Sequence, residues 1–146
     1  MAKLWLLLDE RWMQMKKKLC CAKEYGLISV IGGALYCMLE VLWRGYTHPS
    51  MAIAGGLSLA CIYKENVRHP KRKPIAKCAV SALIITGIEF STGCIVNRML
   101  HMNVWDYSDQ KMNLMGQICP LFSAFWFVLS IPALMICSGV RRRFNH

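Results

Sequence analysis

Two glutamates lie inside long apolar stretches of this 146-residue chain, and they are the residues best placed to do chemistry. Glu40 lies in the second half of the first apolar stretch, and Glu89 holds a similar position in the third. A buried carboxylate without a cation could exchange protons, whereas one held by an arginine would stay charged and structural. Arg44 follows Glu40 by four residues, which permits an ion pair on one helix face. The sequence leaves both roles open.

Each glutamate belongs to a stripe of small and polar residues that predicts the inward face of a helix. The stripe in the first stretch is Ser29, Gly33, Cys37, Glu40 and Arg44. The stripe in the third stretch is Ala82, Thr86, Glu89, Gly93 and Asn97. The second stretch adds small residues at intervals of four, which allow two helix backbones to approach closely: Ala52, Gly56 and Ala60.

Apolar stretches separated by charge runs predict an all-α, polytopic membrane protein with four transmembrane helices. The chain is 55% hydrophobic and 18% charged, and its charges are concentrated between the stretches. One transmembrane domain is expected over residues 25–140, with spans at about residues 26–45, 49–65, 75–100 and 118–140. The second span is short, which leaves three alternatives: it has little tilt, it continues past Tyr63, or it is partly broken near Gly55–Gly56. Pro132 is expected to kink the fourth span.

Residues 1–24 are predicted to form a separate, cytoplasmic amphipathic helix that lies on the membrane surface. The apolar residues recur on one helix face, next to a run of three lysines: Leu4, Leu8, Trp12, Met15 and Leu19. A simple N-terminal extension is the alternative interpretation. Most Lys and Arg residues lie in this segment, in the second connection and in the basic tail at residues 141–146. The positive-inside rule then predicts that both termini are cytoplasmic.

The stretch "NVWDYSDQKMN" joins the third and fourth spans and is expected to face outside, above the buried glutamates. Trp105 and Tyr107 are residue types that favour the membrane–water interface. Asp106 can cap a turn or accept from an arginine, and Asn113 suits a tight return into the last span. We interpret the segment as a lid or lock, and an aromatic-belt turn without a further role is the alternative.

Several other classes of function fit the sequence less well. The net charge of +10 comes from basic residues at the ends of apolar runs, so it indicates topology and not nucleic-acid binding. The eight cysteines form no C-x-x-C pair, which favours small apolar packing residues over a metal site. No nucleophile–base spacing and no phosphate-binding loop stand out, so we expect neither an enzyme nor a cofactor.

The stretch "VWDYSDQKMNLMGQICPLFSAFW" resembles the signature of the ABC-transporter type IV (CmpB-like) family of small bacterial integral membrane proteins. The match consists of Trp105, Asp106, Tyr107, Ser108, Asn113, Gly116, Ile118, Cys119 and Trp126. Upstream, "GIEFSTGCIVNRML" and "MLEVLWRG" are similar to the glutamate-bearing helices of the family. The chain departs from the family in "HPSMAIAGGLSLACIY", where a G-P…P-x-Y-G-like stretch is expected.

The resemblance implies transport in the bacterial plasma membrane. With the two glutamates of the spans, this gives the hypothesis of a permease-like or channel-like protein that moves an ion or small solute through these intramembrane glutamates. The alternative is a non-transporting scaffold or partner subunit whose polar cluster is structural. Four short helices enclose little space, so we expect a homo-oligomer or a membrane partner protein within the lipid bilayer. The residues of the candidate pathway or structural cluster are Glu40, Arg44, Glu89, Asn97, Arg98, Trp105, Asp106, Tyr107 and Asn113.

Overall fold

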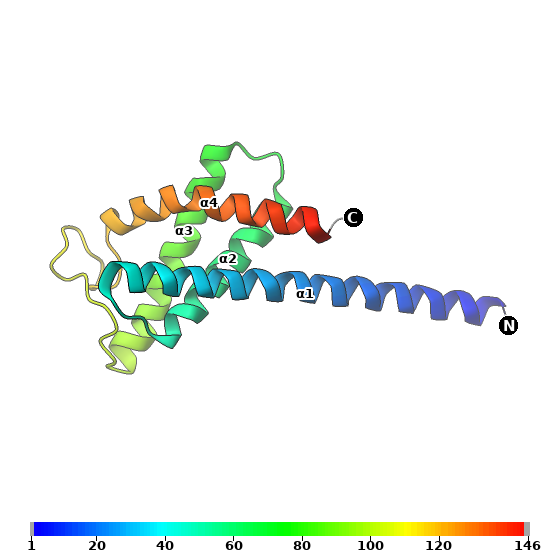
Figure 1. Ribbon diagram of the computed structural model, residues 1–146, viewed down its shortest axis with the longest axis horizontal. Helices are drawn as coiled ribbons and strands as arrows, with labels where there is room; N and C mark the ends of the chain where they lie inside the picture. The colour runs from blue at the N-terminus through cyan, green and yellow to red at the C-terminus, as the bar shows by residue number, and fades with distance from the viewer. Residues whose placement is uncertain (1, 145–146) are drawn as a thin grey trace.

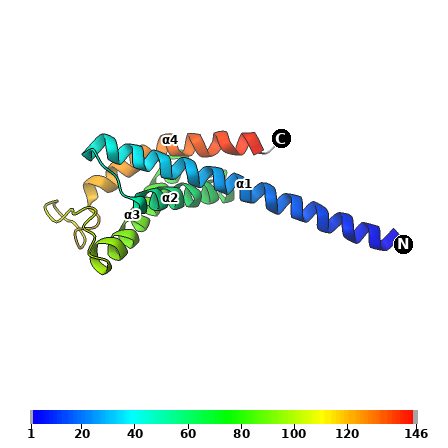
Figure 2. The ribbon, with the colours of Figure 1, turned by 60° about the horizontal axis from the view of Figure 1, so that its bottom comes forward.

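The computed structural model describes the backbone of residues 2–144 and the side chains of residues 21–144. Within this range the chain is helical, and the predicted all-α class is confirmed. The elements are α1 (Ala2–Arg44), α2 (Pro49–Arg68), α3 (Pro74–Gly93), the π-helical segment η1 (Cys94–Met99) that prolongs α3, and α4 (Pro120–Phe144). The termini lie toward one end, and the loop at residues 100–119 lies at the other (Figures 1 and 2).

Among the residues that the structure describes, three helical segments are long and apolar enough to cross a membrane, so the chain is an integral membrane protein. They are Cys21–Arg44 of α1, Pro74–Met99 and Pro120–Phe144. Each coincides with a predicted span, the first, the third and the fourth. Pro132 lies inside α4, which nevertheless continues to Phe144, and the predicted kink stays a prediction.

The prediction of four transmembrane helices is wrong, because α2 is not apolar over a sufficient length. Its apolar part runs from Met51 to Tyr63, and Lys64 and Glu65 follow directly. At 1.5 Å per residue this part is about 20 Å long, against the roughly 30 Å of a bilayer core. The helix is unbroken at Gly55–Gly56, and one face of it is buried against its neighbours.

The separate N-terminal helix is also wrong, because α1 is continuous from Ala2 to Arg44. No proline interrupts this segment, and Gly26 is tolerated inside a helix at a cost of about 1 kcal/mol. The proposed amphipathic face, Leu4 to Leu19, lies outside the residues whose side chains are described. The predicted boundary at residue 24 therefore falls in the middle of one long helix.

Helices α1 and α2 pack through a glycine seam, formed by Gly32, Gly33, Gly55 and Gly56. A Cβ atom on Gly32 would lie 2.5 Å from the carbonyl oxygen of Gly55, and one on Gly55 would lie 2.6 Å from that of Gly32. A Cβ on Gly56 would likewise lie 2.8 Å from the carbonyl oxygen of Ser29. The predicted close approach of two backbones is thus confirmed, and α1 and α2 form the most extensive helix pair.

Helices α3 and α4 form the second well-packed pair, whereas α1 and α4 touch only sparsely. An apolar core joins the two pairs at their centre. It contains buried residues of all four helices: Ile28, Leu59, Ile62, Tyr63, Ile85 and Cys137. The sparse contact between α1 and α4 is what leaves space for the site described next.

Candidate functional site

Glu89 of α3 is buried, with 3% of its surface exposed, and it is held by two neutral donors. The Tyr36 hydroxyl of α1 donates to one carboxylate oxygen at 2.5 Å, and the Trp126 indole N–H of α4 donates to the other at 2.6 Å. No described lysine, arginine or histidine forms an ion pair with this carboxylate. Glu89 therefore joins three helices through groups that leave its charge uncompensated.

Glu40 has the opposite environment, because cationic and hydroxyl partners hold it. Arg44, one turn further along α1, forms an ion pair with it, and the Thr47 hydroxyl donates at 2.6 Å to its second oxygen. The Arg44 guanidinium also donates to the carbonyl oxygen of Val104 at 2.7 Å and lies 4.7 Å from the Tyr46 ring centroid. The predicted pair of Glu40 and Arg44 is confirmed, and it ties the end of α1 to the loop.

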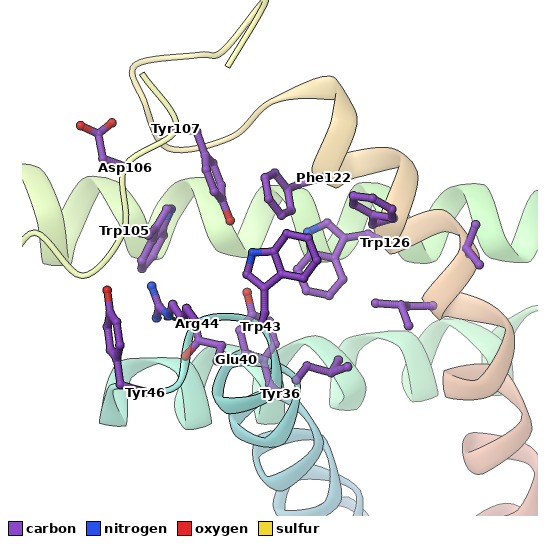
Figure 3. A pocket seen from close by; sticks show the side chains of 14 residues that line it. Tyr36, Glu40, Trp43, Arg44, Tyr46, Trp105, Asp106, Tyr107, Phe122 and Trp126 are labelled. Atoms are coloured by element: carbon purple, nitrogen blue, oxygen red, sulfur yellow. Dashed lines mark hydrogen bonds and ion pairs between the residues drawn. The ribbon is translucent and has the colours of Figure 1, made fainter. Parts of the chain in front are cut away.

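A cavity of about 480 Å³ opens between the end of α1, the start of α4 and the loop. We call it the aromatic pocket, because eight of its fourteen lining residues are aromatic (Figure 3). They are Tyr36, Trp43, Tyr46, Trp105, Tyr107, Phe122, Phe125 and Trp126. Glu40 and Arg44 also line it, and Glu89 lies directly behind Tyr36 and Trp126, whose polar atoms it binds.

The rings of the aromatic pocket are stacked in pairs that fix their faces. Tyr36 and Trp126 stack with ring centroids 5.4 Å apart and planes 28° apart. Tyr107 and Phe122 stack at 4.4 Å and 15°. Figure 3 shows Tyr107 and Phe122 across the cavity from Glu40 and Tyr36. Such stacking covers one face of each ring and fixes the orientation of the rings in the wall of the cavity.

An apolar groove of about 200 Å³ lies next to the aromatic pocket between α1, α2 and α4. The two cavities share Tyr36, Leu39, Trp126 and Leu129. The groove also contains Ser58, whose buried hydroxyl has no hydrogen-bond partner. Together the two cavities mark the α1–α4 interface as the open side of the helix bundle.

A hydrogen-bonded loop lock covers the pocket, centred on the buried Asn97 of η1. The Asn97 amide donates to the carbonyl oxygen of Trp105 at 2.9 Å and to the Gln117 side chain at 2.8 Å. Its own oxygen accepts from the Val104 N–H at 2.7 Å. The Trp105 indole in turn donates to the carbonyl oxygen of Gln117 at 3.0 Å. Asn97 thus satisfies two backbone groups of the first arm of the loop and binds a side chain of the second arm.

The remaining signature residues serve the shape of the same loop. Asp106 accepts from the Ser108 N–H at 2.8 Å and from its hydroxyl at 2.5 Å. Asn113 donates to the carbonyl oxygens of Ser108 and Gln110, at 2.9 and 2.8 Å, and accepts from the Gly116 N–H at 3.0 Å. Gly116 has φ +71°, and a Cβ there would lie 2.7 Å from an Asp106 oxygen. These residues therefore determine the conformation of the loop itself.

Asp106 and Tyr107, which precede Ser108 in the loop, have different electrostatic environments. The hydroxyl and the N–H of Ser108 lower the pKa of Asp106, which is solvent-exposed. Burial raises the pKa of the Tyr107 phenol, and the nearby Glu89 adds to this effect. Asp106 points away from the cavity in Figure 3, whereas the Tyr107 hydroxyl points into it.

The structure brings most predicted site residues together, in three different settings. Glu40, Arg44, Trp105 and Tyr107 line the aromatic pocket with Asp106 at its rim, Glu89 lies behind it, and Asn97 and Asn113 form the loop lock. Asp106 accepts from Ser108, not from an arginine. Arg98 is exposed, and none of its hydrogen bonds or ion pairs joins it to this cluster.

Several residues of the site were missed, because sequence reasoning looked for small and polar faces. Tyr36 and Trp43 lie four residues before and three residues after the predicted Glu40, so the sequence places both rings on the same helix face as this carboxylate. Phe122 and Phe125 form a similar stripe at the start of α4. Gln117 had no detectable signal, since its partner Asn97 is twenty positions away.

The fold and the site define a small helical membrane protein with a ligand-sized aromatic pocket beside a buried carboxylate. The chain belongs to the family described as "Putative ABC-transporter type IV", which it matches over residues 25–144. This match extends over α1 from Tyr25 and over all of α2, α3 and α4, including the loop lock. Comparison with curated proteins and with solved structures gave no match.

Proposed function

We propose that the protein is a permease-like or channel-like membrane protein that moves an ion or small solute by way of the aromatic pocket. The observation that carries this proposal is Glu89, a buried carboxylate with only neutral donors around it. A carboxylate with a purely structural role would be expected to pair with arginine, and the arginine here pairs with Glu40. The negative charge of Glu89 is left for a proton or a cationic solute to neutralise.

The route of this proposal follows the α1–α4 interface. The aromatic pocket opens at the loop end, and the apolar groove continues along the helices past Leu129 toward Pro132. Basic residues at the termini and in the second connection favour a cytoplasmic location for that side of the bacterial plasma membrane. The aromatic pocket would then face outward. A second copy, packed on the open side, would give the groove the outer wall that one chain lacks.

Flux into proteoliposomes tests the proposal. Proton uptake driven by an imposed membrane potential is measured with an enclosed pH-sensitive dye. The wild-type protein is expected to give flux above empty liposomes, and Glu89→Gln to reduce it to that background. Glu65→Gln is the matched control, because Glu65 pairs with Arg72 away from the pocket. Absence of wild-type flux would contradict proton transport, and unchanged flux in Glu89→Gln would contradict the role of this carboxylate.

A scaffold or partner subunit is the second candidate, and the self-contained loop lock favours it. Arg44 joins Glu40 of α1 to Val104 of the loop, and Glu89 joins three helices. In a scaffold these bonds serve stability alone. Glu89→Gln would then lower the melting temperature in detergent while leaving every transport measurement at background, including that of the wild type.

A further inference from the structure

We propose that the aromatic pocket binds an alkylated ammonium group, the chemistry shared by small quaternary amines and by choline-type lipid headgroups. This inference rests on the proposed function in naming the solute class, but binding at the pocket can be measured without transport. The inference is based on three features that occur at one place in the fold: aromatic walls, a buried carboxylate and a cavity of suitable size.

The first argument is the nature of the walls. Alkylated ammonium groups are held by cages of aromatic rings, because the ring faces attract a cation within about 6 Å of the ring centroid. Tryptophan is the best residue type for this contact, and three tryptophans line the pocket: Trp43, Trp105 and Trp126. A metal ion is a poor fit, because no three His, Cys, Asp or Glu side chains of the described residues lie together in a group that could hold one.

The second argument is the position of Glu89 behind two of the rings. Tyr36 and Trp126 both donate their polar hydrogens to this carboxylate, at 2.5 and 2.6 Å. A donor that binds an anion becomes more electron-rich, which strengthens the attraction of its ring face for a cation. The carboxylate also lies directly behind the stacked pair, where it adds to the negative potential of the wall.

The third argument is the local balance of charge. The chain as a whole carries +10, yet the acids near the pocket outnumber its single guanidinium. Arg44 is neutralised by Glu40, donates to Val104 and covers the Tyr46 ring. Its buried Nε–H has no partner and is the one feature that would suit an anion. An anion bound there would also have to face the electron-rich rings, so a cation is favoured.

The cavity is also of suitable size. Its volume of about 480 Å³ falls within the roughly 300–1,000 Å³ typical of small-ligand sites. Trp43 lies at the mouth, with 73% of its surface exposed, so an arriving ligand can cover it. This exposure also means that Trp43 can be replaced without opening a hole in the core.

Three isosteric probes test the charge requirement: choline, its neutral carbon analogue 3,3-dimethylbutan-1-ol, and the anion 3,3-dimethylbutanoate. Binding to the full-length protein in nanodiscs of phosphatidylglycerol is measured by tryptophan fluorescence. Choline is expected to saturate and to bind at least about tenfold more tightly than the neutral analogue. Equal or tighter binding of the neutral analogue or of the anion would overturn the proposal.

Two variants locate the binding. Trp43→Ala is expected to weaken choline binding about tenfold, and Trp43→Phe to weaken it less. Phe127→Ala is the matched control, because Phe127 belongs to α4 but does not line the pocket. Unchanged affinity in Trp43→Ala with loss in Phe127→Ala would place the site elsewhere and overturn the proposal.

Lipid composition distinguishes the two sources of the ammonium group. If a lipid headgroup occupies the pocket, nanodiscs of phosphatidylcholine abolish choline binding by competition. If a free solute is the ligand, choline binds equally in both lipids. Choline binding without any flux would support this inference and contradict the proposed function, whereas flux without choline binding would do the reverse.

Discussion

Helix α1 meets its two partners through interfaces of opposite construction. Against α2 it presents the glycine seam, where the two backbones approach closely and the bases of the Leu59 and Tyr36 side chains lie beside the glycines. Against α4 it presents aromatic and polar side chains that line two cavities. One face of the same helix thus fixes the fold, and the other is free to carry a site. Small residues let two helices pack closely. Large rings that do not interdigitate leave a cavity between the helices.

The largest effect is expected from a change in the glycine seam. Gly55→Ala places a methyl group 2.6 Å from the Gly32 carbonyl oxygen, so the two backbones must separate. We expect a loss of about 3 kcal/mol or more in the free energy of unfolding, measured by thermal unfolding in detergent. Gly87→Ala is the control, because nothing lies within 4 Å of the added group, and it should gain up to about 1 kcal/mol. Equal melting temperatures for both variants would refute the distinction.

The loop lock above the open side is the next most sensitive feature. Asn97→Ala removes three hydrogen bonds and leaves the buried N–H of Val104 without a partner. We expect a loss of about 2 kcal/mol, together with faster hydrogen exchange at residues 104–117. Arg98→Ala, at the exposed neighbouring position, should change the stability by less than about 0.5 kcal/mol. Slow exchange retained in Asn97→Ala would contradict the role of Asn97.

Two buried serines sharpen the comparison further. Ser130 of α4 donates to the carbonyl oxygen of Trp126 at 2.7 Å, whereas the hydroxyl of Ser58 in the apolar groove has no partner. Ser130→Ala should therefore cost about 1 kcal/mol, and Ser58→Ala should cost nothing or stabilise slightly. Chemical denaturation of both variants in mixed micelles gives the comparison. A larger loss for Ser58→Ala would mean that this hydroxyl already serves a bond in the membrane.

The smallest effect is expected at the exposed rim, from Asp106→Asn. Since Ser108 lowers the pKa of Asp106 below its ordinary value of 3.8, the folded state favours the carboxylate. The stabilisation is present above pH 3.8 and is lost as the pH falls through the lowered value. The wild type should melt slightly higher than the variant at pH 7, and this difference should narrow at pH 3. If the difference in melting temperature between the wild type and the variant grew at low pH, the predicted direction of the pH dependence would be wrong.

Periodicity and charge distribution were sufficient to predict the helical class, three of the spans and the pair of Glu40 and Arg44. They wrongly predicted that α2 spans the membrane. Small residues at intervals of four indicate close helix packing, but they do not show whether the helix is long enough to cross a bilayer. They also placed a boundary near residue 24, where a change in composition from charged to apolar does not interrupt the helix. A helix continues as long as its residues favour helical backbone angles, and both the charged and the apolar residues around position 24 do so.

The partners of Glu89 could not be predicted from local pattern alone. Tyr36 precedes it by 53 positions and Trp126 follows it by 37, so only the packing of three helices reveals the contact. The loop signature was located correctly, but its meaning was not evident from residue types. Asn97 lies outside the signature and yet organises it, and the π-helical turns of η1 carry this residue beneath the loop.

The backbone of the loop has a consequence for the order of assembly. Each of the four described non-glycine residues with positive φ lies between residues 100 and 119: His101, Asn103, Met112 and Met115. Such conformations cost of order 1–3 kcal/mol each and persist only when surrounding contacts impose them. Those contacts come from Asn97 on one side and from the Tyr107–Phe122 stack on the other. We therefore expect the loop to fold last, after α3 and α4 are both inserted, so that an ordered loop indicates a completely assembled helix bundle.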